Sequence, residues 1–125
     1  MKAYFYFRSP VDEKKAKEVS MQIAEVIVSS GFKIVEGNIC ISPDNNNLGY
    51  ILECFNMCIV GIVATESDAL VVPSLSTIHP KEEFAKAMLG MLVDAGLLVF
   101  VIKNNELVAY KSSIDKELMY EEFTS

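Results

Sequence analysis

The segment from Asp68 to Pro80 constrains the fold of this 125-residue chain more than any other. It opens with Asp-Ala-Leu-Val-Val, a short apolar run that is typical of a central strand buried on both faces of a parallel sheet. Pro73 ends the run and a polar loop extends to His79. Pro80 then suits the first turn of a helix, because proline has no amide hydrogen to leave unpaired. Open α/β sheets bind ligands at such strand-to-helix corners, so this loop is the first place to look for a site.

The rest of the chain alternates between strand-like and helical patterns. The aromatic run from Lys2 to Arg8 favours a first strand, which Ser9 and Pro10 break. Short apolar runs and helical periodicity then predict the other main elements. Further strands are expected at Phe32–Ile41 and Leu97–Ile102, and helices from Asp12 to Gly31, from Leu48 through Ile62 and from Pro80 to Asp94.

Three local features of these elements are less direct to interpret. Gly37 in the second strand is expected to mark a bulge. The second helix is apolar around most of its surface, and its last part, Cys58 to Ala64, fits a strand as well as a helix. In the third helix, the residues expected to face inward are Phe84, Met88, Met91, Leu92 and Ala95.

The C-terminal part of the chain predicts an antiparallel edge. Asn104-Asn105 makes a plausible two-residue hairpin turn, so Glu106 to Tyr110 should return antiparallel beside the preceding strand. Ser113 to Phe123 has the pattern of a short terminal helix, with Ser113 as a cap. We therefore expect one α/β domain over residues 1–125, a three-layer sandwich with a mainly parallel five-stranded sheet. Its core would occupy residues 1–112 and the short C-terminal helix residues 113–125.

Composition narrows the functional classes. The formal net charge of −6 argues against a surface that follows nucleic-acid phosphates, since such affinity depends on lysine and arginine. Direct DNA binding is therefore not expected. The N-terminus lacks a signal-peptide core, and no apolar run reaches the ~20 residues that a membrane helix needs. We expect a cytoplasmic protein that does not enter a membrane.

The three cysteines also favour a reducing compartment, because their number is odd and their surroundings are apolar. Cys54 and Cys58 lie one helical turn apart, a spacing that is compatible with a metal ion. No histidine or acidic partner accompanies them in the pattern, so core packing is the favoured interpretation. We expect no metal and no cofactor.

Several segments together resemble the N-terminal catalytic domain of serine recombinases, the resolvases and invertases. The resemblance covers roughly residues 1 to 112. It rests on Tyr-Phe-Arg at the end of the first strand, on a helix that ends in Ser-Gly-Phe, on Asp-Ala-Leu-Val-Val followed by Ser-Leu-Ser, and on a helix that runs into Ala-Gly-Leu-Leu-Val. It implies a resolvase-like fold. It also implies chemistry in which a serine attacks a DNA phosphate while arginines stabilise the transferring group.

Carried over residue by residue, most of that active site is missing. The family pattern is aromatic-x-Arg-x-Ser, and here Arg8 stands at the arginine position but Pro10 at the nucleophile position. Ser9 stands one residue early, and would replace the nucleophile only if the chain turns there. After the third strand the family has Leu-Asp-Arg-Leu-x-Arg, whereas this chain keeps Leu75 and loses the acid and both arginines. The arginine expected after the second strand is also absent, and the chain holds no other arginine.

Each remaining candidate has a structural interpretation beside the functional one. Arg8 could bind a phosphate or form an ion pair at the strand end. Ser9 could be a nucleophile, but the only histidine, His79, is remote in sequence and no other base is evident. A small anion could be bound by a set of loop residues that would serve equally well in capping a helix, namely Ser74, Ser76, Thr77 and His79.

Three functions of different classes remain open. The favoured one is a resolvase-like domain that has lost DNA strand cleavage and acts as an interaction or regulatory module. Its partners would be further copies of itself, through the second or the terminal helix, or a recombinase-type protein. The first alternative is an active phosphoryl-transfer domain that uses Arg8 and Ser9. The second is a small α/β domain that binds a phosphorylated ligand at its strand ends, although no glycine-rich phosphate loop is present.

Overall fold

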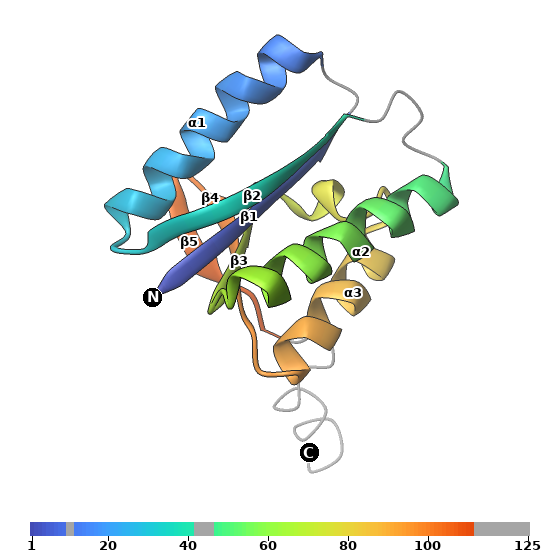
Figure 1. The fold of residues 1–125 in the computed structure, drawn as a ribbon. Helices are drawn as coiled ribbons and strands as arrows, with labels where there is room; N and C mark the ends of the chain where they lie inside the picture. The colour runs from blue at the N-terminus through green and yellow to red at the C-terminus, as the bar shows by residue number, and fades with distance from the viewer. Residues whose placement is uncertain (10–11, 42–46, 112–125) are drawn as a thin grey trace.

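The computed structural model describes residues 1–9, 12–41 and 47–111, which form a three-layer α/β sandwich (Figure 1). Helix α1 (Glu13–Ser29) covers one face of the sheet, and helices α2 (Leu48–Thr65) and α3 (Glu82–Asp94) cover the other. The core is correspondingly divided into two clusters of buried side chains, one on each side of the sheet. The helix predicted over residues 113–125 lies outside the described residues.

The sheet has five strands in the order β2-β1-β3-β4-β5. Their bounds are Lys2–Ser9 for β1, Lys33–Ile41 for β2, Ala69–Val72 for β3, Leu98–Lys103 for β4 and Glu106–Ala109 for β5. The first four are parallel, and β5 pairs antiparallel with β4 at the edge. This arrangement confirms the predicted mainly parallel sheet with one antiparallel edge strand.

The central strand β3 is as short and apolar as the sequence predicted. All four of its side chains are buried, because β3 lies between β1 and β4 and is covered by helices on both faces. The hairpin between β4 and β5 is also confirmed. Asn104 and Asn105 both have positive φ angles, 51° and 60°, which the tight two-residue turn requires and which asparagine tolerates better than most residues.

Helix α1 begins and ends where its sequence signals are placed. The Asp12 side chain accepts a hydrogen bond of 2.8 Å from the Lys15 backbone N–H, so it caps the helix. Gly31 follows the helix with a φ of 90°, a conformation that favours glycine. The bulge of β2, however, is not at Gly37. The pairing register shifts between Ile34 and Glu36, and Gly37 instead lies under the ring of Phe5, where a larger side chain would collide.

The stretch that fitted either a strand or a helix, Cys58 to Ala64, is helical. It belongs to α2, whose first turn is capped by the Asn47 side chain. Judged by length and composition alone, α2 could cross a membrane. In this structure it packs on the sheet as a core-covering helix, and the side chains that it buries are Ile51, Cys54, Phe55, Cys58 and Ile62.

The prediction for the inward face of α3 was wrong in part. The buried residues are Ala85, Leu89 and Gly90, whereas Phe84 and Met91 are exposed. The helix carries two adjacent apolar stripes, and periodicity alone does not say which of them faces the sheet. The small residues Ala85 and Gly90 lie on the buried side, where they permit close approach of the helix. The helix also begins at Glu82, so Pro80 precedes it rather than opening it.

Substitution of Leu89 tests this orientation of α3. Because Leu89 is fully buried, Leu89→Ala should lower the free energy of unfolding by about 2–5 kcal/mol. The matched control is Leu98→Ala, which removes the same atoms from a side chain that is 42% exposed and should cost far less. Urea denaturation of both variants measures the difference. Equal losses in the two variants would show that the face of α3 is assigned wrongly.

Candidate functional site

The sheet order places a topological switch point between β1 and β3. The chain leaves β1 toward β2 on one side, and β3 lies on the other, so the connections diverge at the carboxyl ends of these two strands. Ligands of open α/β sheets bind at such a crevice. Arg8 and Ser9 end β1, and the loop that follows β3 contains the short 3-10 helix η1 (Leu75–Thr77). The two predicted groups of site residues are therefore brought to the same edge of the sheet.

The guanidinium of Arg8 is directed at this loop. Arg8 is only 2% exposed; its Nε donates a hydrogen bond of 3.2 Å to the Thr77 carbonyl oxygen, and its Nη2 donates one of 3.3 Å to that of Ser76. A buried cation needs such acceptors, since desolvation without them is costly. Arg8 thus ties the end of β1 to η1. Ser9 is the last residue of the strand and pairs with Ile41 of β2.

Three of the four predicted loop residues line one cavity of about 400 Å³. Ser74, Ser76 and His79 contribute to its wall, together with Glu82 and with Lys103 at the end of β4. The hydroxyl oxygens of Ser74 and Ser76 are 2.8 Å apart and hydrogen-bonded to each other. Thr77 is buried instead. Ser74 precedes η1, but its side chain makes no capping hydrogen bond there.

His79 is held in one protonation state by its surroundings. Its Nδ1 accepts a hydrogen bond of 3.0 Å from the Lys81 backbone N–H, which leaves the proton of the neutral ring on Nε2. Burial lowers the pKa of His79, and the positive charges of Arg8 and Lys81 lower it further. The imidazole is therefore neutral at pH 7 and offers one N–H donor rather than a positive charge.

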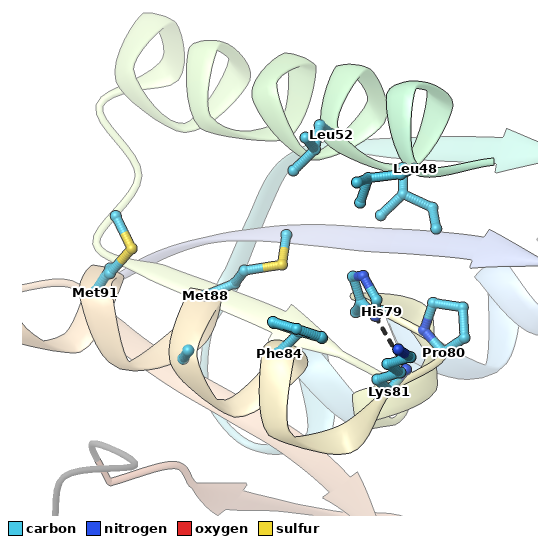
Figure 2. A pocket seen from close by; sticks show the side chains of 10 residues that line it. Leu48, Leu52, His79, Pro80, Lys81, Phe84, Met88 and Met91 are labelled. Carbon is cyan, nitrogen blue, oxygen red and sulfur yellow. Dashed lines mark hydrogen bonds between the residues drawn. The ribbon is translucent and has the colours of Figure 1, made fainter. Parts of the chain in front are cut away.

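Beside this polar edge lies an apolar groove that the sequence did not predict. It has a volume of about 580 Å³ and runs between the first turns of α2 and the outer face of α3 (Figure 2). Leu48 and Leu52 come from α2, and Phe84, Met88 and Met91 come from α3, while His79 and Lys81 stand at one end. The sequence signal for this groove was the second apolar stripe of α3. That stripe was predicted to face the sheet, and it lines the groove instead.

The three thiols lie inside the layer between α2 and the sheet. Cys40 of β2 and Cys54 and Cys58 of α2 are buried and free. Burial is the main cause that raises the pKa of Cys40 to about 12, and it raises that of Cys58 further, so these thiols stay protonated at neutral pH. Among the described residues no group of three histidine, cysteine or acidic side chains could hold a metal ion. The buried Tyr6 hydroxyl in the same layer has no hydrogen-bond partner in the described part.

Comparison with solved structures relates this geometry to known proteins. The N-terminal catalytic domain of TP901-1 integrase matches with a TM-score of 0.59 and 13% identity, covering 98% of this chain and 95% of that one. The C-terminal catalytic domain of ISC1926 TnpA, an IS607-like serine recombinase, matches with a TM-score of 0.53 and 16% identity, covering 99% and 79%. No protein-family model and no curated protein matches the sequence. At such identities the likeness concerns the fold, and it confirms the resolvase-like fold expected from the sequence.

Substitution of Arg8 tests its structural contact with the loop. Arg8→Met should lower the free energy of unfolding by about 1–3 kcal/mol, because the buried carbonyl of Thr77 and the partly buried carbonyl of Ser76 lose a charged donor. The matched control is Lys103→Met, which removes an exposed cation from the same edge and should change stability by less than about 0.5 kcal/mol. Thermal and urea denaturation provide the measurement. An Arg8→Met variant as stable as the parent would exclude this structural role.

Proposed function

We propose that this chain, a domain with the fold of serine recombinase catalytic domains, has lost DNA strand cleavage and acts as an interaction or regulatory module. The observation that carries the proposal is the placement of Arg8. The only arginine of the chain is buried at the switch point and donates hydrogen bonds to two backbone carbonyls of the loop after β3. A guanidinium used in this way holds the loop in place instead of facing a phosphate.

The other groups at this edge do not replace the missing cations. Recombinase-type attack needs a hydroxyl in line with phosphorus and positive groups around the phosphate oxygens, and the loss of one such group typically costs ~10²–10³ in rate. Here His79 is neutral, and Lys103 shares its cavity with the carboxylate of Glu82. By the sequence resemblance, Pro10 takes the position of the nucleophile. The negative net charge of −6 further disfavours approach of DNA.

The outer face of α2 supplies a contact surface for the proposed module. Met57, Val60 and Val63 are each more than half exposed on this face. Beside them lies a shallow cavity of about 460 Å³, whose lining includes Gly61 of α2 and Tyr4 of β1. Projecting valines next to a hollow form a self-complementary patch, as a two-fold contact between identical chains requires. We therefore propose a second copy of the chain as the partner at this surface.

The loss of cleavage predicts that no covalent complex forms with DNA. The protein is incubated with labelled supercoiled and linear DNA, and the products are separated on a denaturing gel. We expect neither cleavage nor an adduct, whereas an active serine recombinase run in parallel should give both. An adduct that disappears in Ser9→Ala would overturn the proposal, because it would identify Ser9 as a nucleophile.

Self-association through α2 is tested separately by sedimentation. Val60→Lys places a charge on the exposed patch and should raise the dissociation constant of the dimer by about tenfold or more, which corresponds to about 1.4 kcal/mol. Val28→Lys is the matched control, since Val28 is equally exposed but lies on α1 across the sheet. A parent protein that sediments as a monomer at high micromolar concentration would contradict the proposed partner.

A further inference from the structure

The groove between α2 and α3 exposes a large apolar surface at one place. Phe84 is 49% exposed and Met91 72%, and Leu52 faces them from α2 at 50% (Figure 2). Single exposed apolar side chains are ordinary, but a contiguous group that lines a groove marks a binding surface. We propose that residues 112–125 of the same chain bind in this groove and cover it.

The sequence of this C-terminal segment suits an apolar groove. Ile114 and Leu118 recur at helical spacing, and Met119 and Phe123 form a second apolar stripe with the same spacing. The segment also holds four acidic residues against one lysine. Its negative charge matches the end of the groove formed by Lys81, whose ammonium lies 5.7 Å above the Phe84 ring and has no ion-pair partner in the described part.

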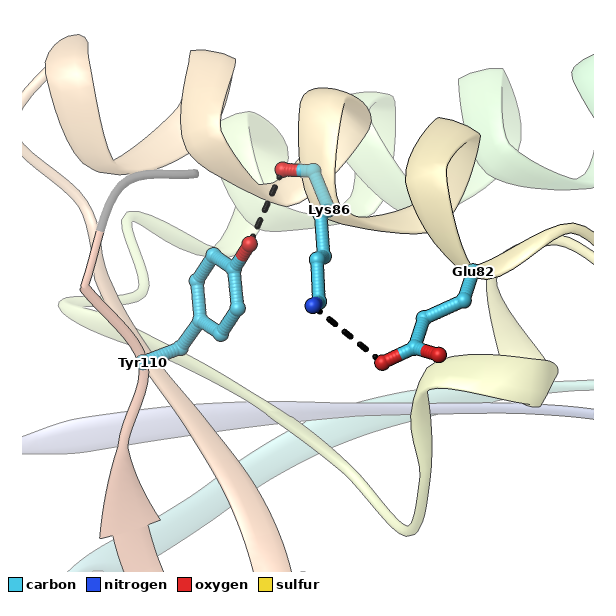
Figure 3. A network of polar contacts seen from close by, with 3 residues as sticks. All are labelled: Glu82, Lys86 and Tyr110. Carbon is cyan, nitrogen blue, oxygen red and sulfur yellow. Dashed lines mark hydrogen bonds and ion pairs between the residues drawn. The ribbon is translucent and has the colours of Figure 1, made fainter. Parts of the chain in front are cut away.

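The described chain ends next to α3, within reach of the groove. The Tyr110 hydroxyl donates a hydrogen bond of 3.1 Å to the Lys86 carbonyl oxygen of α3, and the Lys86 ammonium in turn pairs with Glu82 at 3.2 Å (Figure 3). The Tyr110 backbone N–H is held by the Val99 carbonyl of β4. The chain therefore leaves the sheet beside the helix that forms one wall of the groove.

Chain length favours this occupant over a second molecule. Three extended residues after Tyr110 span about 10 Å, roughly the diameter of a helix with its side chains, so the segment can cross α3. The remaining residues, 114–125, would be about 18 Å long in helical form, enough to follow the groove. A tether this short gives an effective concentration in the millimolar range. At micromolar protein concentrations the chain's own segment should outcompete a second copy.

The proposed contact leaves free the face of α2 that we propose as the contact between copies. The groove lies on the wall of α3 and the first turns of α2, whereas the proposed contact between copies uses the outer residues of α2 after Asn56. The inference holds whether or not the domain cleaves DNA.

A single tryptophan in the full chain tests the contact. The natural sequence has no tryptophan, so Phe84→Trp introduces one fluorophore into the groove. We expect blue-shifted emission and protection from acrylamide quenching, both unchanged on hundredfold dilution. Leu118→Ser in the same background should shift the emission to the red and increase quenching. Glu117→Ser introduces the same residue at a position outside the apolar stripes, and it should change neither the emission wavelength nor the quenching.

Two further reporters keep the result interpretable. Val28→Trp on α1 lies across the sheet and should not respond to Leu118→Ser. Met91→Trp is a second groove reporter if Phe84→Trp fails to fold, as judged by circular dichroism. The proposal is overturned if a groove reporter in the full chain emits like a solvent-exposed tryptophan and if Leu118→Ser does not change this emission. Protection that increases with protein concentration also overturns it, because a second copy would then be the occupant.

Discussion

The buried guanidinium of Arg8 links the two strands that meet at the switch point. It comes from the end of β1 and donates hydrogen bonds to the carbonyl oxygens of Ser76 and Thr77 in the loop after β3. A charge at 2% exposure needs hydrogen-bond acceptors, and the two loop carbonyls are among those that Arg8 has. η1 lies where Arg8 contacts the loop, and His79 follows shortly after it. Arg8 on β1 therefore contacts the loop that leads to α3 and to one end of the groove.

The same interaction bears on the proposed loss of cleavage. Serine recombinase chemistry requires cations that are exposed to a phosphate. In this chain the single arginine stabilises the protein interior, and the surrounding hydroxyls and the neutral imidazole pair with groups of the chain itself. Fold and catalytic function depend on different properties of the same residues, so a fold can persist where the chemistry does not.

Sequence patterns predicted the elements whose signals are local. Four buried residues between polar neighbours identified β3, and Asn104-Asn105 identified the final hairpin, since both signals lie within a few residues of the element itself. The inward face of α3 could not be read in this way, because Phe84 and Ala85 belong to two stripes of similar hydrophobicity. The bulge of β2 was misplaced for a related reason, since the role of Gly37 depends on Phe5 of a neighbouring strand. For the site, the sequence identified Arg8 and the loop of Ser74 to His79 as separate candidates, and it did not indicate that the guanidinium points at that loop.

The buried thiols have a consequence for how the layers of the protein separate. Cys54 and Cys58 lie on the inner face of α2, Cys40 lies on β2, and all three are buried. A thiol reagent reaches them more readily when α2 lifts from the sheet, and the raised pKa values of Cys40 and Cys58 slow the reaction of these two thiols. Their rate of modification under native conditions therefore measures how often the layer between α2 and the sheet opens locally.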